Sequence, residues 1–289
     1  MNETLFKKYN VPVPRYTSYP TANEFEPFDA HRYIEAVETS NDAAADNISF
    51  YIHVPFCRHL CHYCGCNSVA MAQPKRIEEY FETLHQEIDL LLTHLRKDRR
   101  ISQIHYGGGS PSSMPLSLIR GINEHLLSAF STIDKPEIAI ECHPGYLESN
   151  DWQYLLDSGF NRFSLGIQDF NTDVLRTVNR RPSLLPVADI MEILRKGGAK
   201  VNFDFIYGLP KQTTTEFVST IQTAISLHPN RLVTFSYAHL PSLFKRQMIL
   251  EKAGLPLQTE KLKMFEEASK MLQSAGYVPI GMDHFVLPD

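Results

Sequence analysis

The sequence predicts an α/β protein built on a parallel β-sheet, because six strand-like runs alternate with amphipathic runs along most of the chain. The strand-like runs are short, rich in β-branched and aromatic residues, and mostly bounded by loop or turn residues. Right-handed crossovers through the amphipathic runs would bring the strands side by side. The pattern leaves two architectures open, which are an open doubly wound sheet and a complete or partial (β/α) barrel.

The strand-like runs begin after a proline-containing N-terminal stretch and continue almost to the last residue. They are predicted at residues 48–54, 101–106, 137–142, 162–166, 201–206 and 231–236, with a last strand-like piece at 278–281. The first crossover is longer than the others because it includes a cysteine-rich loop.

Helices are predicted between the strands from apolar residues at helical spacing. In the first helix the apolar stripe consists of Ile77, Phe81, Leu84, Ile88, Leu91 and Leu95. The predicted helices are 77–95, 115–130, 184–196, 213–227 and 260–274. Gly197 and Gly198 are typical of a helix C-terminus, and Thr213 begins a run of possible N-caps.

Residues 1–47 carry few periodic signals and are predicted to form an extended N-terminal arm, with one short helix at 29–39. Four prolines interrupt this stretch, at Pro12, Pro14, Pro20 and Pro27. The predicted organisation is therefore an arm at 1–47 followed by a single β/α domain at 48–289.

Composition narrows the class of protein. Of 289 residues, 43% are hydrophobic and 21% charged, as in ordinary globular proteins. The formal net charge of −5 argues against non-specific nucleic-acid binding, so an anionic ligand would need local cations or backbone N–H groups. No run approaches the roughly 18 apolar residues of a membrane span, and no secretory signal precedes the first strand. We expect a cytoplasmic protein.

Four of the five cysteines, Cys57, Cys61, Cys64 and Cys66, lie within ten residues, directly after the first predicted strand. An odd, clustered set in a chain without a secretory signal indicates metal or catalytic chemistry rather than disulfides. Cys57, Cys61 and Cys64 form C-x3-C-x2-C, and three such thiolates can hold three irons of a [4Fe–4S] cluster, leaving the fourth iron open to a ligand. Two alternatives remain, a structural zinc ion and an ordinary electron-transfer cluster completed by Cys66.

Further polar or glycine-rich motifs fall at the ends of the later predicted strands. At or just past the carboxyl ends of successive strands lie Cys57, Gly107–Gly109, Glu141, Gln168, Tyr207 and Tyr237–His239. Catalytic groups of β/α barrels collect on that face. Asp204 lies inside the fifth strand among apolar residues, and a buried carboxylate needs partners or a function.

Together these motifs resemble the oxygen-independent coproporphyrinogen III oxidases, bacterial enzymes of haem synthesis in the radical S-adenosylmethionine (SAM) superfamily. The motifs that carry the resemblance run from about Tyr9 to the last residue, and C-x3-C-x2-C extends to Cys66 and Asn67. The other matching motifs are Pro14–Thr21, Tyr106–Gly109, Ser164–Asn171, Asp204–Thr213, Tyr237–Pro241 and Gly281–Phe285. The resemblance implies a partial (β/α)6 barrel.

The resemblance also implies functional residues. Cys57, Cys61 and Cys64 would bind the [4Fe–4S] cluster and Cys66 would not. Two SAM molecules are implied, and the positions matching Tyr63, Gln168, Arg180, Asp204 and Ala238 contact the second. The remaining implied SAM-binding residues are Tyr51, Gly108, Gly109, Ser110 and Glu141. The chain departs from the family pattern with Ser110-Pro111-Ser112 in place of Thr-Pro-Thr, and with His143 in place of Asp.

The implied activity is decarboxylation of two propionates of coproporphyrinogen III to vinyl groups without oxygen, giving protoporphyrinogen IX. It needs an electron donor for the cluster, and we expect a monomer. Arg15 and Lys211 are candidate partners for the substrate carboxylates. The alternative is a haem-binding chaperone without oxidase activity, which is expected to lack Cys66 and the 16–20 motif. Since family members are longer, we expect a C-terminally truncated member without the family's C-terminal domain.

Overall fold

The structure is a computed structural model that describes residues 3–9, 21, 24–43 and 46–288. The chain divides into two compact units, Met1–Ala44 and Ala45–Asp289. The first unit contains helices α1 (Glu3–Tyr9) and α2 (Ala30–Ala43). Helix α2 corresponds to the predicted helix 29–39, and it starts where the Asp29 carboxylate accepts the N–H of Arg32 at 2.8 Å. Within the predicted extended arm, helix α1 was not predicted, and residues 10–20 lie outside the described residues.

The second unit contains an eight-stranded sheet in the order β1-β4-β5-β6-β7-β8-β10-β9. Its first six strands are parallel, and each matches a predicted strand. They are β1 (Asn47–Val54), β4 (Arg100–Gly108), β5 (Thr132–Cys142), β6 (Arg162–Gln168), β7 (Lys200–Tyr207) and β8 (Arg231–Ser236). Among the described residues β1 and β9 form the two edges of the sheet, and they do not pair with each other. The partial (β/α)6 barrel is therefore confirmed.

Two short strands extend the sheet beyond β8, and the first of them, β10, runs in the opposite direction. Strands β10 (His284–Val286) and β9 (Val278–Pro279) are antiparallel, with β10 paired to β8. The predicted strand at 278–281 corresponds to β9, whereas β10 was not predicted, since three residues are too few for a periodic signal. No helix of the described chain is long and apolar enough to cross a membrane.

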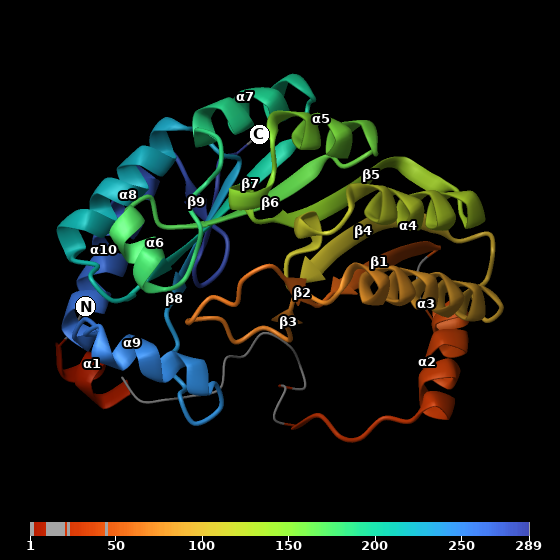
Figure 1. Cartoon of the computed structure of the whole chain (residues 1–289), viewed down its shortest axis with the longest axis horizontal. Helices are drawn as coiled ribbons and strands as arrows, with labels where there is room; N and C mark the ends of the chain where they lie inside the picture. Colours follow the sequence, from red (N-terminus) through yellow and green to blue (C-terminus); the bar gives the residue numbers. More distant parts are fainter. Residues whose placement is uncertain (1–2, 10–20, 22–23, 44–45, 289) are drawn as a thin grey trace. The chain divides into compact units, whose positions relative to one another are not determined.

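Helices cover the convex side of the sheet (Figure 1). They are α3 (Pro74–Leu92), α4 (Leu116–Ala129), α5 (Ser149–Asp157), α7 (Val187–Lys196), α8 (Thr214–Ser226) and α10 (Gln258–Ser274). The predicted caps are present, since Thr213 forms a capping box with Glu216, and Gly198 follows α7 with φ of +73°. Sequence analysis missed α5, which buries only Trp152 and Leu155.

The short elements lie in the loops between strands and helices. Helices α6 (Thr172–Thr177) and α9 (Met248–Lys252) follow β6 and β8. Single 3-10 turns occur at η2 (Pro111–Ser113), η3 (Pro144–Tyr146) and η4 (Lys245–Gln247). Strands β2 (Phe56–Cys57) and β3 (Val69–Ala70) form a separate parallel pair. These loops build one end of the barrel and carry most of its motifs.

The two faces of the parallel sheet differ in composition because side chains alternate along each strand. On the outer face, fully buried apolar side chains pack under the helices. They include Ile104, Ile140, Phe163, Leu165, Phe203, Phe205 and Leu232. On the inner face, polar side chains alternate with these residues and line a cavity. They include Gln103, His105, Glu141, Arg162, Ser164, Asn202, Asp204 and Arg231.

Candidate active site inside the partial barrel

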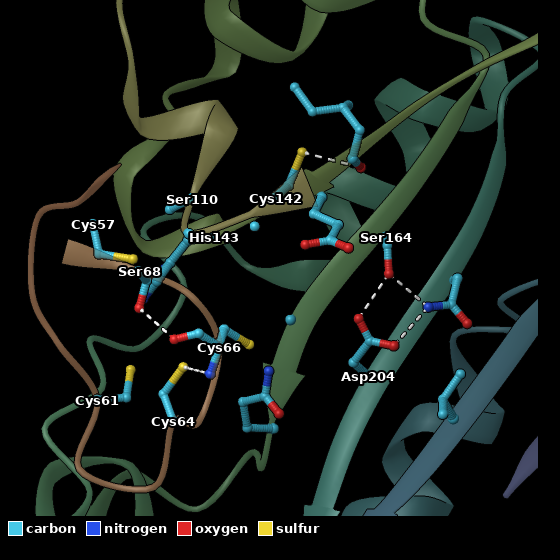
Figure 2. A pocket seen from close by; sticks show the side chains of 18 of the residues that line it. Cys57, Cys61, Cys64, Cys66, Ser68, Ser110, Cys142, His143, Ser164 and Asp204 are labelled. Atoms are coloured by element: carbon cyan, nitrogen blue, oxygen red, sulfur yellow. Dashed lines mark hydrogen bonds between the residues drawn. The ribbon is translucent and has the colours of Figure 1, made fainter. Parts of the chain in front are cut away.

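The inner face of the sheet and the loop between β1 and α3 enclose a cavity of about 660 Å³. Figure 2 shows the cysteine side chains on one side of this cavity and the Ser164–Asp204 pair on the other. The cavity lies in the second unit of the chain. Its size and its polar inner wall are typical of a small-molecule site.

Backbone pairing holds the cysteine loop at its base. Strands β2 and β3 pair, with Val69 N donating to Pro55 O at 2.9 Å and Met71 N to Cys57 O at 2.8 Å. The residues between them form a closed loop, and all four of its cysteines line the cavity. Cys61 is buried and Cys66 is exposed, and all four thiols are free.

Nearby polar groups donate hydrogen bonds to the loop sulfurs. The N–H of Cys66 donates to Cys64 Sγ at 3.4 Å, and Arg180 Nη1 donates to Cys61 Sγ at 3.6 Å. Burial and then the charges of Cys64 and Cys61 raise the pKa of Cys57 to about 11, whereas a hydrogen bond from Cys66 lowers the pKa of Cys64 to about 6. The side-chain hydrogen bond between these two thiols, together with burial, raises the pKa of Cys66.

This donor set fits a [4Fe–4S] cluster better than a zinc ion. A structural zinc ion binds four ligands around one point. A cluster instead binds each thiolate to a different iron, so its cysteines stand apart. Hydrogen bonds to the sulfurs, as at Cys61 and Cys64, are typical of such clusters.

The glycine run at the end of β4 packs against the first strand and the cysteine loop. A Cβ on Gly109 would lie 2.5 Å from the Pro55 carbonyl oxygen, and a Cβ on Gly108 would lie 2.6 Å from the His53 ring. Gly108 also has φ of +113°, a conformation that favours glycine. The glycines are therefore required by the protein's own backbone as well as by any ligand. Ser110 follows, buried, with its hydroxyl 2.7 Å from Ser113 Oγ.

Tyr51 and Glu141 meet across this glycine run. A Cβ on Gly107 would lie 2.9 Å from Glu141 Oε1 and 3.0 Å from the Tyr51 hydroxyl. His105 stacks on Tyr51 with ring centroids 5.8 Å apart, and its Nε2 lies 3.4 Å from Glu141 Oε1. Glu141 lines the cavity as predicted, while Tyr51 is 59% exposed and stands beside the lining.

Arg180 is not the solvated surface charge that its loop position suggests. Its guanidinium lies beside the cysteine loop, where Nη1 donates to the Tyr63 hydroxyl at 3.1 Å and Nη2 donates to the Gly166 carbonyl. Burial raises the pKa of the Tyr63 phenol, which is therefore neutral. Gly166 leaves room for this contact, since a Cβ there would lie 2.7 Å from Arg180 Nη2.

Gln168 combines a strained backbone with an unsatisfied side chain. It has φ of +67°, and the β6–β7 register shifts between Gly166 and Gln168. Its buried Oε1 has no hydrogen-bond partner among the described residues. Backbone strain and an orphaned buried acceptor at one residue are typical of a position kept for a ligand.

Asp204 is partly buried and held by two neutral groups on the inner face. Its carboxylate accepts from Ser164 Oγ at 2.7 Å and from Asn202 Nδ2 at 2.8 Å. Burial raises its pKa, although these two hydrogen bonds act in the opposite direction. Since the nearest donors are neutral, the carboxylate can still bind a polar ligand. Figure 2 shows this network facing the cysteine side.

Some predicted positions lie elsewhere. Ala238 is exposed and does not line the cavity, and its carbonyl accepts from Gln247 Nε2 at 3.2 Å. Lys211 is an exposed residue outside the cavity lining, and Arg15 lies outside the described residues. The cavity instead contains cations that sequence analysis missed, namely Arg58, Arg162 and Arg231. Period-two alternation could have identified Arg162 and Arg231, which open their strands on the inner face.

The wall near Cys61 also contains groups that the sequence did not bring together. His59 Nδ1 lies 2.7 Å from the Tyr146 hydroxyl, and Arg58 stacks over the Tyr146 ring at 5.1 Å. Buried His143, which departs from the family pattern, accepts the N–H of Gly145 through Nδ1 at 3.1 Å. Burial lowers its pKa to about 2. Cys142, remote in sequence from the cysteine loop, lines the same cavity.

Comparison with known proteins supports this description. The family model of the radical SAM superfamily matches residues 51–224. Oxygen-independent coproporphyrinogen III oxidases from Salmonella typhimurium and Escherichia coli are 41% and 40% identical over 99% of this chain. The chain spans 62% of the length of both relatives. The solved structure of coproporphyrinogen III oxidase from Escherichia coli superposes with a TM-score of 0.88 at 38% identity, covering 99% of this chain and 64% of the other.

Proposed function

Since the chain belongs to the radical SAM superfamily, we propose that it performs the radical chemistry of an oxygen-independent coproporphyrinogen III oxidase. The main support is the identity of about 40% with such oxidases over nearly the whole chain, combined with the cavity between the cysteine loop and the inner face. The substrate would be coproporphyrinogen III. Each of two propionates would lose a hydrogen atom, carbon dioxide and one electron in becoming a vinyl group.

In this proposal Cys57, Cys61 and Cys64 hold a [4Fe–4S] cluster, and Cys66 stays outside the ligand set. When bound, the cluster and SAM supply a carbon-centred radical that removes the hydrogen atom. The C-x3-C-x2-C spacing of these three cysteines supports this ligand set. The N–H of Cys66 would keep its present role as a donor to Cys64 Sγ.

One SAM molecule would lie along the glycine run. There, Gly108, Gly109 and Ser110 offer backbone and hydroxyl groups, and the Glu141 carboxylate suits a SAM ammonium group. Tyr51 beside Glu141 would border this site. The closeness of these residues to one another, across β1, β4 and β5, supports a single binding site.

A second SAM molecule would lie between the cysteine loop and the inner face. The orphaned Gln168 Oε1 and the Asp204 carboxylate would accept its N–H and O–H groups, and Arg180 would bind its carboxylate. Tyr63, bonded to Arg180, would orient that guanidinium. Ala238 would contribute through its backbone, because its side chain is not part of the cavity wall.

The four carboxylates of the substrate need cations that a chain of net charge −5 must supply locally. We propose Arg58, Arg162 and Arg231 for this role in place of Arg15 and Lys211. Arg162 pairs with Glu137 at 2.6 Å. Arg231 donates only through Nε, to Asn202 at 3.1 Å, among the described residues, so its terminal nitrogens remain available for a carboxylate.

The chain would also need an electron donor, a reducing compartment and a defined oligomeric state. An electron donor must reduce the cluster, and a compartment that keeps thiols reduced suits the free cysteines, which favours the cytoplasm. We propose that the chain acts as a monomer. The alternative, a haem-binding chaperone, has no specific support here, because the most similar relatives reported above are oxidases.

The experiment is anaerobic reconstitution of the chain with iron and sulfide, followed by assays of SAM cleavage and of porphyrinogen decarboxylation. We expect about four irons per chain, SAM cleavage, and vinyl products. Cys61→Ala should lose the cluster, while the matched variant Cys66→Ala should retain it. Haem binding without SAM cleavage would favour the chaperone, and equal loss of iron in both variants would refute the ligand set.

A further inference from the structure

A short segment after β8 contacts the middle of the cysteine loop. The contacting residues are Phe244, Arg246 and Gln247, around turn η4, and they meet Tyr63, Cys64 and Gly65. About 180 residues separate the two segments in sequence. Three successive residues of the loop therefore have partners in one remote turn, and the central one is a proposed cluster ligand.

Arg246 donates twice to one carbonyl. Its Nη2 and Nε lie 2.6 and 3.1 Å from the carbonyl oxygen of Cys64. A planar guanidinium that donates two bonds to one oxygen fixes the orientation of the peptide that follows Cys64. It also places a positive charge beside the Cys64 carbonyl, where partial burial limits screening by solvent.

Gln247 joins the loop to the end of β8. It is 1% exposed, and its Nε2 donates to Tyr63 O at 2.9 Å and to Ala238 O at 3.2 Å. Its Oε1 accepts the N–H of Leu240 at 2.5 Å. The buried amide thus satisfies backbone groups of two segments, and no shorter or apolar side chain would satisfy both.

Phe244 completes the contact at a glycine. A Cβ on Gly65 would lie 3.0 Å from the Phe244 ring, so the ring packs directly on the loop backbone because residue 65 has no side chain. A bulky residue at position 65 would separate the two segments. The three contacts together fix the part of the loop that includes Cys64.

We propose that Arg246 and Gln247 are positioning residues that fix Cys64 as a cluster ligand, and that the charge of Arg246 raises the reduction potential of the cluster. This inference rests on the proposed function, since it assumes that Cys64 binds the cluster. The reduced cluster carries one more negative charge than the oxidised one, so a nearby cation stabilises the reduced form. If Arg246 only held the cysteine loop in place, removing its charge would change the order of the loop but not the reduction potential of the cluster.

The test compares Arg246→Met, Arg246→Lys and the control Lys245→Met in the reconstituted chain. Lys245 is the exposed neighbour of Arg246 in the same turn, so its replacement removes the same charge without a loop contact. The readouts are iron content, the midpoint potential from a redox titration, and the electron paramagnetic resonance spectrum of the reduced cluster. None of these depends on turnover.

We expect Arg246→Met to reduce the ratio of reduced to oxidised cluster about tenfold at a fixed potential, a shift of about 59 mV to lower potential for one electron. Arg246→Lys should keep the potential near that of the unmodified chain but change the spectrum, because an ammonium cannot reproduce the two planar bonds. Lys245→Met should change neither. If Arg246→Met loses its cluster, retention in the other two variants still supports the positioning role.

Gln247→Leu tests the second residue, with exposed Gln273→Leu on α10 as its control. We expect Gln247→Leu to lower cluster occupancy and broaden the spectrum, while the control matches the unmodified chain. The inference is wrong if Arg246→Met and Gln247→Leu keep the original potential and spectrum, or if Lys245→Met shifts the potential equally. Absence of a cluster in the unmodified chain would instead refute the proposed function.

Discussion

The outer and inner faces of the parallel sheet are built from the same strands, yet they are opposite in chemistry. In β6 the outward residues Phe163 and Leu165 are fully buried under helices, whereas the inward residues Arg162 and Ser164 line the cavity. Parallel sheets usually bury apolar side chains on both faces. Here the outer face is apolar, whereas the inner face is mainly polar, with a few buried apolar residues such as Val233.

The outer face therefore serves mainly stability, and the inner face serves mainly ligand binding. The outer face removes large apolar side chains from water, and each contributes about 1.5–3 kcal/mol. The inner face instead holds polar groups that must satisfy one another, as Asp204 does with Ser164 and Asn202. Such groups add little net stability, so their presence on so many strands is explained by what the cavity binds.

The largest expected effect comes from adjacent substitutions on the two faces. Phe163→Ala should lower the free energy of unfolding by about 3–5 kcal/mol, because it empties a fully buried site beside Trp152 and Phe160. Ser164→Ala should lower it by only about 1.5 kcal/mol, through lost hydrogen bonds to Asp204 and Asn202. Urea unfolding of the cluster-free chain measures both.

For SAM binding, unlike stability, Ser164→Ala should have the larger effect and Phe163→Ala the smaller one. In the folded fraction, Phe163→Ala should bind SAM as the unmodified chain does, whereas Ser164→Ala should bind it more weakly, because Asp204 loses one of the two donors that hold its carboxylate. Equal stability losses for the two variants, or weaker SAM binding only in Phe163→Ala, would contradict the division between the faces.

The contrast between the two faces also explains which parts of the structure could be predicted from the sequence. The outer face produces the apolar runs, so all six parallel strands and five of the main helices were predicted to within a few residues. Helix α5 and strand β10 were missed, since one has two buried residues and the other has three residues in all. Both depend on tertiary packing rather than on a local pattern.

The inner face was predicted only where a motif marked it. The cysteines, the glycine run and Glu141 line or border the cavity as expected, but their roles as ligands remain predictions. Arg162 and Arg231 carry no motif, and sequence analysis did not use the strand alternation that places them on the inner face. The position of Arg180 beside Cys61, 119 residues away in sequence, follows from the fold and not from a local pattern.

A second, smaller effect is expected from pH at the end of β5. The pKa of His143 is about 2 in the folded chain, chiefly because of burial and then because of Arg180, against about 6.5 when unfolded. Below pH 6.5 the unfolded chain binds a proton that the folded chain does not, so stability falls with falling pH. The loss from this residue should reach about 1.4 kcal/mol at pH 5.5.

His143→Asn should remove this contribution, since an Asn side chain can still accept the N–H of Gly145 without titrating. The measurement is the difference in unfolding free energy between pH 7.5 and pH 5.5, compared with the unmodified chain. His31→Asn, at an exposed histidine of α2, serves as the control. An unchanged pH dependence in His143→Asn would mean that His143 is already protonated when folded.

The smallest expected effect concerns strain on the inner face. Gln168 and Lys211 both have φ of +67°, but only Gln168 lines the cavity. Glycine adopts this conformation without steric cost, although it loses more entropy on folding. Gln168→Gly and Lys211→Gly should therefore each raise the free energy of unfolding by up to about 1 kcal/mol, measured by urea unfolding of the cluster-free chain.

The two variants should separate when SAM binding is measured by calorimetry on the reconstituted chain. Gln168→Gly removes the buried Oε1 that lacks a partner, so the second SAM should bind more weakly. Lys211→Gly should bind SAM as the unmodified chain does. The strain at Gln168 would then be maintained for a ligand, whereas the same backbone conformation at Lys211 serves only a turn. Unchanged SAM binding in Gln168→Gly would show that the inner face tolerates strain for folding alone.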